Sequence, residues 1–277
     1  MTQYNAIFRG GLIYDGSGEP PYIGDVAVDG DRISVVGPAA SLSTADNEHD
    51  IAGLAIAPGF IDAHTHDDRI VLDAPDMQPK ISQGVTTVVV GNCGISLAPV
   101  IFSGDPPAPM NLLGGREAYS FPNFKSYAAT LSKSAPAVNV AALIGHSALR
   151  LAVMDDVRRR ATTGEVEAMR SLADEAMNSG ATGFSTGLFY PTNEAADANE
   201  VASIASRFAE HGGVYATHMR DEFDHVLESI DESAQTAAAA KIPLIISHHK
   251  CAGPANWGRT KETLPKLFYK GAHQATL

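Results

Sequence analysis

Cysteine is almost absent from this sequence of 277 residues, which contains only Cys93 and Cys251. Two cysteines cannot form the disulfide framework that is typical of small secreted proteins. The first ten residues hold no long apolar run, and no later segment approaches the roughly 20 apolar residues that span a bilayer. These absences predict a cytoplasmic protein that has no membrane partner.

Positive charge is also scarce. Lysine and arginine together number 20, against 32 aspartates and glutamates, so the formal net charge is −12. A protein of this sign repels the phosphates of nucleic acids, and the densest basic run, at residues 158–160, stands alone. We therefore expect no nucleic-acid partner. The hydrophobic share of 44% supplies a sizeable core and excludes intrinsic disorder.

The pattern of apolar residues divides the chain into two domains, residues 1–57 and 58–277. The first contains short strand-like runs that are interrupted by glycine. Asp29 and Gly30 stand between two of these runs and fit a hairpin turn, because glycine accepts the positive φ that such a turn needs. We expect a small, incomplete β-sheet here, and its clearest runs are residues 6–8, 12–14, 26–28 and 33–36.

The second domain alternates continuous apolar runs with amphipathic helical stretches. Continuous runs are typical of strands that are buried on both faces. Strands that alternate with helices predict an α/β fold with a parallel sheet, and both an open sheet and a closed barrel remain possible. The six expected strands lie at residues 59–63, 86–90, 138–144, 181–184, 214–216 and 243–246.

Three of the expected helices have recognisable ends. Thr162 and Glu165 form a capping box, and Gly180 ends that helix. Asn199 is expected to cap the next helix, which would run to residue 211. The third would begin near residue 221 and end before residue 243.

Histidine and cysteine side chains follow the ends of five of the six expected strands. His64 and His66 end the first strand, and residues two apart on a strand point to the same side. The carboxyl ends of parallel strands form the edge at which α/β folds build their sites. Imidazole and thiolate groups are the ligands that zinc prefers, so this pattern predicts a metal site. The later strands end at Cys93, His146, His218 and the pair His248–His249.

The neighbours of these residues leave several alternatives open. His248 and His249 face opposite ways on a strand, so only one of them should be a ligand. His146 is equally consistent with a ligand and with a residue that hydrogen-bonds to one. Asp67 and Asp68 could orient the histidines, but we favour a solvated loop. Cys251 is interpreted as structural or surface-exposed.

Several longer motifs resemble a known family. The run APGFIDAHTH at residues 57–66 looks like the opening signature of the amidohydrolase superfamily. Within that superfamily the chain resembles the D-aminoacylases, which are N-acyl-D-amino-acid deacylases. The motifs that carry this resemblance are HTHDD (64–68), ISQGVTT (81–87), GNCGISLAP (91–99), THMRDE (217–222), ISHHK (246–250) and ETLP (262–265).

The resemblance implies a metal-dependent hydrolase (β/α)₈-type barrel, with about six of eight units present, and a small β-sandwich to which residues 1–57 contribute. It implies Zn²⁺ as the metal and an N-acyl-D-amino acid as the small-molecule substrate. Cys93 would bridge a tight site with His218 and His248, and His64 and His66 would form a weaker one. The resemblance thus selects His248 over His249.

The resemblance also places the catalytic aspartate at the end of an eighth strand. Only six strand–helix units precede Leu277, so we expect a truncated chain that is inactive by itself. Two alternatives remain open, a cyclic-amide hydrolase related to dihydroorotase and a metal-binding fragment without activity. The lack of a lysine after the fourth expected strand counts against the first alternative.

Overall fold

The computed structural model describes residues 4–38, 42, 44–270 and 275–276. The chain divides into two compact units, Met1–Phe60 and Ile61–Leu277. Among the described residues, no helix combines the length and the apolar character that crossing a membrane requires.

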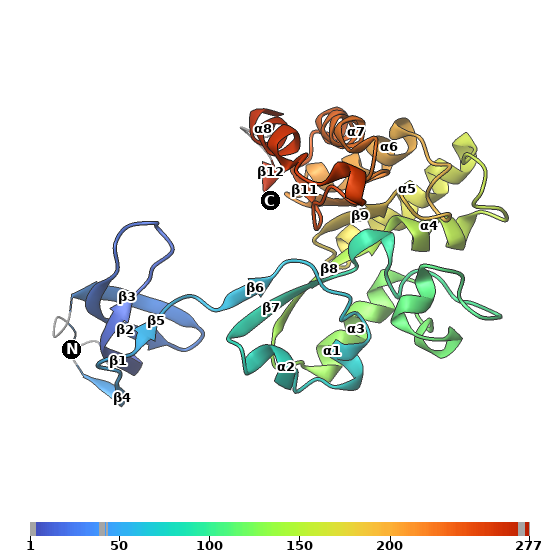
Figure 1. Ribbon diagram of the computed structural model, residues 1–277. Coiled ribbons are helices and arrows are strands. Elements are labelled where there is room, and N and C mark those ends of the chain that lie inside the picture. Colours follow the sequence, from blue (N-terminus) through green and yellow to red (C-terminus); the bar gives the residue numbers. More distant parts are fainter. Residues whose placement is uncertain (1–3, 39–41, 43, 271–274, 277) are drawn as a thin grey trace. The chain divides into compact units, whose positions relative to one another are not determined.

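The first unit is built on a five-stranded mixed sheet (Figure 1). Four strands lie in the order β3-β2-β1-β4, and β5 also pairs with β1. Strand β2 pairs antiparallel with both β1 and β3, whereas β4 and β5 run parallel to β1. The bounds are β1 Tyr4–Ile13, β2 Tyr22–Asp29, β3 Arg32–Pro38, β4 Ala45–Asp50 and β5 Ala55–Ile56.

Two features of this sheet differ from the expected strands. The runs at residues 6–8 and 12–14 belong to the single strand β1, which changes register between Phe8 and Gly11, where Gly10 has a φ of +71°. Strand β4 was not predicted, because its sequence ADNEHD is polar and mostly exposed. The hairpin turn between β2 and β3 is confirmed, with Gly30 at a φ of +59°.

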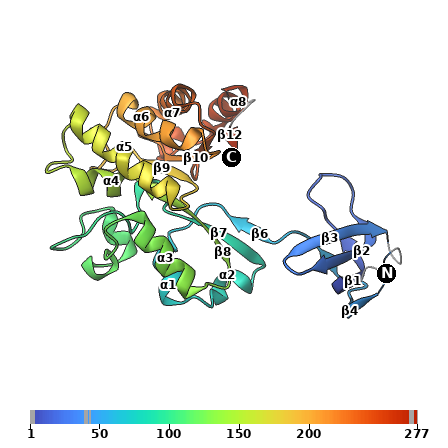
Figure 2. The ribbon, with the colours of Figure 1, turned by 180° about the vertical axis from the view of Figure 1, so that it is seen from behind.

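The second unit contains a parallel sheet in the order β12-β11-β10-β9-β8-β7-β6. It curls into half of a barrel, and helices follow one another around its outer side (Figures 1 and 2). The predicted α/β fold is confirmed, and all six expected strands are present. The bounds are β6 Phe60–Asp62, β7 Val85–Val90, β8 Asn139–Gly145, β9 Gly183–Gly187, β10 Val214–His218, β11 Leu244–Ile246 and β12 Ala275–Thr276.

Helices lie between successive parallel strands along the chain, as in βαβ units. The longer ones are α3 Phe124–Ser134, α4 His146–Val153, α5 Thr163–Asn178, α6 Ala198–Ala209, α7 Val226–Ala240 and α8 Thr260–Lys270. The short ones are α1 Ile70–Asp73, α2 Gln78–Ile81 and the 3₁₀ turns η1 Asn92–Gly94, η2 Met110–Leu113, η3 Arg116–Ala118 and η4 Pro254–Asn256.

The ends of three helices test the sequence analysis. The capping box of Thr162 and Glu165 is confirmed on α5. The cap predicted at Asn199 is wrong. The cap is Asp197, whose side chain accepts hydrogen bonds from the N–H groups of Asn199 and Glu200. Helix α7 begins at residue 226 rather than near 221, because the Asp221 carboxylate accepts hydrogen bonds from the N–H groups of Phe223 and His225 and makes a turn there.

The core of the second unit lies between the sheet and its helices. All five residues of β9 are buried, which explains why this strand shows no polar alternation. The ring of Phe184 on β9 lies 6.2 Å from Phe208 of α6 and 5.9 Å from Tyr215 of β10, measured between centroids. These ring contacts pack β9 and β10 against α6.

Candidate metal centre

Four strands deliver histidine and cysteine side chains to one edge of the curled sheet. His64 and His66 follow β6, Cys93 lies in η1 after β7, His218 ends β10, and His248 follows β11. Cys93 and His248 have left-handed backbones, with φ values of 56° and 38°. Non-glycine residues adopt this conformation at a cost, and such residues are frequent at functional sites.

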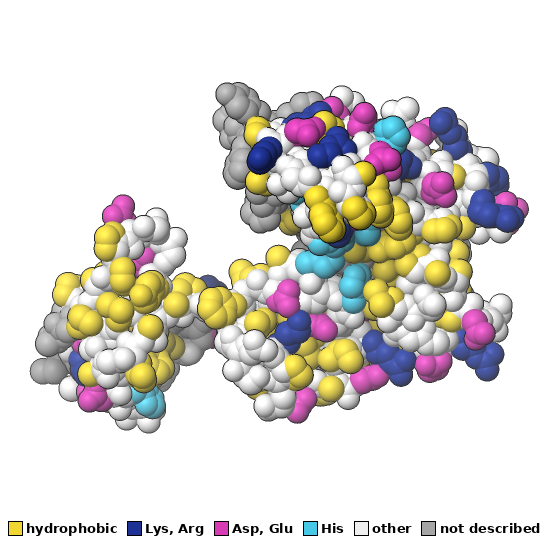
Figure 3. Space-filling model, in the orientation of Figure 1, with side chains coloured by type: hydrophobic (Ala, Val, Ile, Leu, Met, Phe, Trp, Pro, Cys, Tyr) yellow, Lys and Arg dark blue, Asp and Glu magenta, His cyan; other side chains and the backbone are white. Residues whose placement is uncertain are grey.

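The side chains of these residues meet. Cys93 Sγ lies 3.4 Å from His64 Nε2 and 3.5 Å from His248 Nε2. The ring of His248 is 4.9 Å from that of His64 and 4.4 Å from that of His218, measured between centroids. His66 lies at the margin of the cluster, with its ring centroid 5.5 Å from that of His64. Figure 3 shows histidine side chains gathered at a hollow in the surface of the second unit.

The protonation of the cluster favours metal binding. Burial, together with the neighbouring imidazoles, lowers the pKa of His64 to about 4, and burial also lowers the pKa of His66. Both rings are therefore neutral at pH 7 and offer a lone pair. Burial, with the nearby Glu222 carboxylate, raises the pKa of Cys93 to about 12. A metal ion that binds this thiol must displace its proton.

The donor set fits a divalent metal ion. The nitrogen and sulfur atoms of His64, Cys93 and His248 all lie within 4.8 Å of one another, as do donor atoms of His218, Glu222 and His248. His66 Nδ1 is buried and has no hydrogen-bond partner in the part of the chain that the structure describes. Imidazole and thiolate ligands of this kind suit zinc and other metals that prefer nitrogen and sulfur.

Glu222 is a member of the cluster that the sequence analysis missed. It lies in the loop between β10 and α7 and is 5% exposed. Its Oε1 is 3.2 Å from His248 Nδ1, and its Oε2 is 3.3 Å from His218 Nε2 and accepts a hydrogen bond from Lys250. The sequence feature that could have indicated Glu222 is its position four residues after His218, in the motif THMRDE.

Aromatic side chains line one side of the cluster. Phe189 stacks on His218 at 5.5 Å between ring centroids and lies 6.5 Å from Phe223. The Tyr190 hydroxyl is 3.2 Å from His218 Nδ1. Beyond Phe189 opens a cavity of about 750 Å³, lined also by Leu188, Glu194, Arg220, Asp221, His225, Glu228, Ser229 and Glu232.

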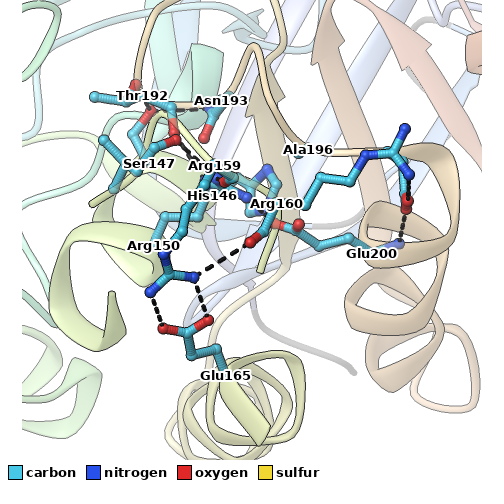
Figure 4. Close-up of polar contacts among 12 residues, drawn as sticks. His146, Ser147, Arg150, Arg159, Arg160, Glu165, Thr192, Asn193, Ala196 and Glu200 are labelled. Carbon is cyan, nitrogen blue, oxygen red and sulfur yellow. Dashed lines mark hydrogen bonds and ion pairs between the residues drawn. The ribbon is translucent and has the colours of Figure 1, made fainter. Parts of the chain in front are cut away.

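The other histidines singled out in the sequence lie apart from the cluster. His249 Nε2 is 2.8 Å from the hydroxyl of Thr263, which also lies 3.9 Å from the Cys251 thiol. His146 is fully buried, and its Nε2 is 2.9 Å from Glu200 Oε1. Figure 4 shows His146 in a separate polar network with Arg150 and Glu200. The structure therefore places His146 and His249 outside the group that meets at Cys93.

The solvated loop expected at Asp67 and Asp68 is wrong for Asp68, which is 1% exposed. Burial raises the pKa of Asp68 to about 7. Asp67 is half-buried, and its carboxylate lies 3.0 Å from Lys80 Nζ. The loop was misjudged because aspartates after a strand usually face water, whereas this segment runs under Tyr127, whose hydroxyl donates to the Asp68 carbonyl.

Comparison with known proteins agrees with this geometry. Residues 47–275 match the model of the amidohydrolase family. The chain is 48% identical to a D-aminoacylase of Alcaligenes xylosoxydans xylosoxydans over 98% of its length and 56% of the relative's. A D-aminoacylase structure, described as having a binuclear metal centre, is 47% identical at a TM-score of 0.93, over 98% of this chain and 57% of that one.

A third comparison concerns an N-acyl-D-glutamate deacylase of Bordetella bronchiseptica, solved with zinc and a phosphonate that mimics the tetrahedral intermediate. It is 38% identical to this chain at a TM-score of 0.92 and is matched over 100% of this chain and 58% of its own. The chain thus spans a little over half the length of the proteins it resembles.

Proposed function

Since the chain belongs to the amidohydrolase family, we propose that it carries the metal site of a zinc-dependent hydrolase that cleaves the amide bond of N-acyl-D-amino acids. The observation that carries the proposal is the convergence of His64, Cys93, His218 and His248 from four separate strands. The substrate class is supported by the similarity to a D-aminoacylase and to an N-acyl-D-glutamate deacylase.

We assign the metal ligands to His64, His66, Cys93, His218 and His248. Cys93 Sγ lies between His64 Nε2 and His248 Nε2, at 3.4 and 3.5 Å, which supports a bridging role. Cys93, His218 and His248 would hold the tighter ion, and His64 and His66 the weaker one. A zinc ion held there would supply Lewis-acid activation of the attacking water and of the scissile carbonyl.

The residues around the ligands orient them and exclude water. The Tyr190 hydroxyl holds the His218 ring through Nδ1, and Phe189 covers the face of the same ring. The adjoining cavity of about 750 Å³ lies within the range of small-molecule sites. A cyclic-amide hydrolase is the less favoured alternative, because β9, with the sequence GFSTG, offers no lysine to bridge two metals.

We further propose that residues 1–277 alone do not hydrolyse these substrates. The aspartate that the resemblance places on an eighth strand has no counterpart in the described sheet, which runs from β6 to β12. Among the residues that the structure describes, β6 and β12 each pair with one neighbouring strand of this sheet. Loss of a positioned acid–base group typically costs about 10²–10⁴ in rate.

The metal assignment is tested by elemental analysis of the purified chain and of its two cysteine variants. The wild type and Cys251→Ala should retain about one zinc per chain, and Cys93→Ala should lose it, because thiolate is a principal zinc ligand. Cys251 is the matched control, since its thiol lies beside Thr263 and outside the cluster. Equal zinc in Cys93→Ala and the wild type would remove Cys93 from the site.

The substrate assignment is tested with N-acetyl-D-methionine and its L-enantiomer. Residues 1–277 should leave both intact, whereas a longer protein that also carries the eighth strand should hydrolyse only the D-enantiomer. Equal rates on the two enantiomers, or hydrolysis of cyclic amides alone, would contradict the assigned class. Family-like turnover by residues 1–277 would contradict the proposed inactivity.

A further inference from the structure

Lys250 and Glu222 both contact the same nitrogen of a proposed metal ligand. Glu222 Oε1 lies 3.2 Å from His248 Nδ1, and Lys250 Nζ lies 2.9 Å from that atom. The opposite nitrogen, Nε2, faces Cys93 Sγ. A neutral imidazole carries one proton, on either Nδ1 or Nε2. The group that hydrogen-bonds to Nδ1 therefore determines whether Nε2 has a free lone pair.

The two partners would impose opposite tautomers. A carboxylate only accepts, so pairing with Glu222 requires the proton to sit on Nδ1 and leaves the Nε2 lone pair free. An ammonium group only donates, so pairing with Lys250 requires a bare Nδ1 and places the proton on Nε2. An Nε2–H group cannot bind a metal ion.

We propose that Glu222 is a positioning residue that keeps His248 in its metal-binding tautomer and draws the Lys250 ammonium away from Nδ1. The proposal rests on the metal site proposed above. Oε1 of Glu222 accepts the Nδ1 proton, and Oε2 accepts a hydrogen bond from Lys250. One buried carboxylate therefore satisfies both neighbours, and each partner has its own oxygen.

The surroundings hold Glu222 in this place. Its backbone carbonyl accepts a hydrogen bond of 2.7 Å from the N–H of Ala252, which joins the loop after β10 to the loop after β11. Asp221 fixes the next turn through the N–H groups of Phe223 and His225. The carboxylate thus reaches His248 from a constrained backbone, as partners that orient metal-binding histidines commonly do.

The competing role for Glu222 is that of a direct ligand, because its Oε2 also lies 3.3 Å from His218 Nε2. The two roles differ in how Lys250 matters. If Glu222 selects the tautomer, removal of Lys250 relieves the loss of Glu222, because nothing then forces the proton onto Nε2. If Glu222 is a ligand, removal of Lys250 restores nothing.

The experiment measures zinc affinity of the 277-residue chain by competition with a chromophoric chelator. Glu222→Ala should weaken zinc binding by about 10- to 100-fold, the usual effect of losing a residue that orients a ligand. Lys250→Met alone should bind zinc at least as tightly as the wild type. The double variant Glu222→Ala, Lys250→Met should recover most of the loss. Glu167→Ala is the matched control, because this exposed glutamate on α5 pairs with Arg170 and lies outside both the cluster and the cavity.

Cobalt(II) supplies a readout of the ligands themselves. At saturating cobalt, the visible spectrum of Glu222→Ala should keep the wild-type band shape, because the ligand set is unchanged. An altered band shape, a double variant no tighter than Glu222→Ala, or weaker binding by Lys250→Met would overturn the inference. A wild-type chain that binds no zinc would instead overturn the proposed function, so the two failures are distinguishable.

Discussion

His248 and His249 are adjacent, yet the structure gives them different surroundings. His248 Nε2 faces Cys93 Sγ, whereas His249 Nε2 is paired with the Thr263 hydroxyl at 2.8 Å. Both residues follow β11, which ends at Ile246, and the left-handed backbone of His248 turns the chain between them. The expected alternation along a strand predicted that only one of the two histidines would be a ligand. It did not indicate which one.

The pair provides a test with a built-in control. His248→Ala should lose most of the bound zinc, because it removes a nitrogen that faces the thiol, and His249→Ala should retain the wild-type amount. Zinc content of both purified variants is measured by elemental analysis, with circular dichroism to confirm folding. Retention of zinc by His248→Ala and its loss by His249→Ala would reverse the assignment.

Some residues of the cluster could be predicted from the sequence, and others could not. Cys93 and the histidines were predictable because each follows an apolar strand, and parallel strands end at a common edge. Glu222 was not, since its partners Lys250 and His248 lie on another loop, and the contact exists only after β10 and β11 pair. Asp68 was misjudged for a similar reason, because it is buried beside residues that are distant in sequence, such as Tyr127, whose hydroxyl donates to the Asp68 carbonyl.

At the scale of elements, a buried ionic network ties α4 to α6 and to the connections around them. Arg150 on α4 is fully buried and pairs with Glu200 on α6. Its Nε donates to the Thr192 carbonyl, and its Nη2 donates to the carbonyls of Val157 and Arg159. The connection that leads from β9 toward α6 carries Tyr190, so this network supports the segment that holds His218.

Glu200→Gln tests the network. The substitution leaves the Arg150 charge buried without its carboxylate, and breaking a buried pair in this way costs about 3–5 kcal/mol. Urea denaturation at pH 7 should show this loss. Glu210→Gln, an exposed glutamate at the end of the same helix, should change stability by less than about 0.5 kcal/mol. A Glu200→Gln variant as stable as the control would show that the network is dispensable.

The same network sets a dependence on pH. Burial alone would raise the pKa of Glu200, but hydrogen bonds from His146 and Arg150 hold it at about 2, below its ordinary value of 4.5. A lowered carboxylate pKa stabilises the folded state fully above about pH 4.5, and this stability is lost as the pH falls toward 2. The difference in stability between wild type and Glu200→Gln should therefore shrink on acidification below pH 4.5.

The ends of the helices were predictable where neighbouring residues alone determine them. The capping box on α5 was readable because Thr162 and Glu165 satisfy each other within one turn. The first residues of α6 and α7 were not predicted correctly. The carboxylates of Asp197 and Asp221 accept hydrogen bonds from nearby backbone N–H groups, in place of the residues that were expected to begin these helices. Strand β4 has polar residues and exposed side chains, so its pairing with β1 alone defines it.

At the scale of the whole molecule, the proposed metal would link strands β6 and β7 to strands β10 and β11 of the curled sheet. A ligand that binds only the folded state stabilises it, by about 2.7 kcal/mol at a free concentration 100 times its Kd. The zinc-loaded chain should therefore melt at a higher temperature than the chelator-treated chain. Calorimetry of both forms measures this difference, and Cys93→Ala should show none. Identical melting of the two wild-type forms would contradict a metal that bridges the strands.

Cys93 and His248 are separated by 155 residues, so they leave the ribosome at different times during synthesis. A ribosome releases His64 and His66 first and His248 last among the proposed ligands, and folding of a nascent chain proceeds from its N-terminus. The early imidazoles and the Cys93 thiol must wait while β8 to β11 emerge and pair. The proposed metal would therefore be bound late in synthesis, and a bound ion would indicate that the strands from β6 to β11 have assembled in register.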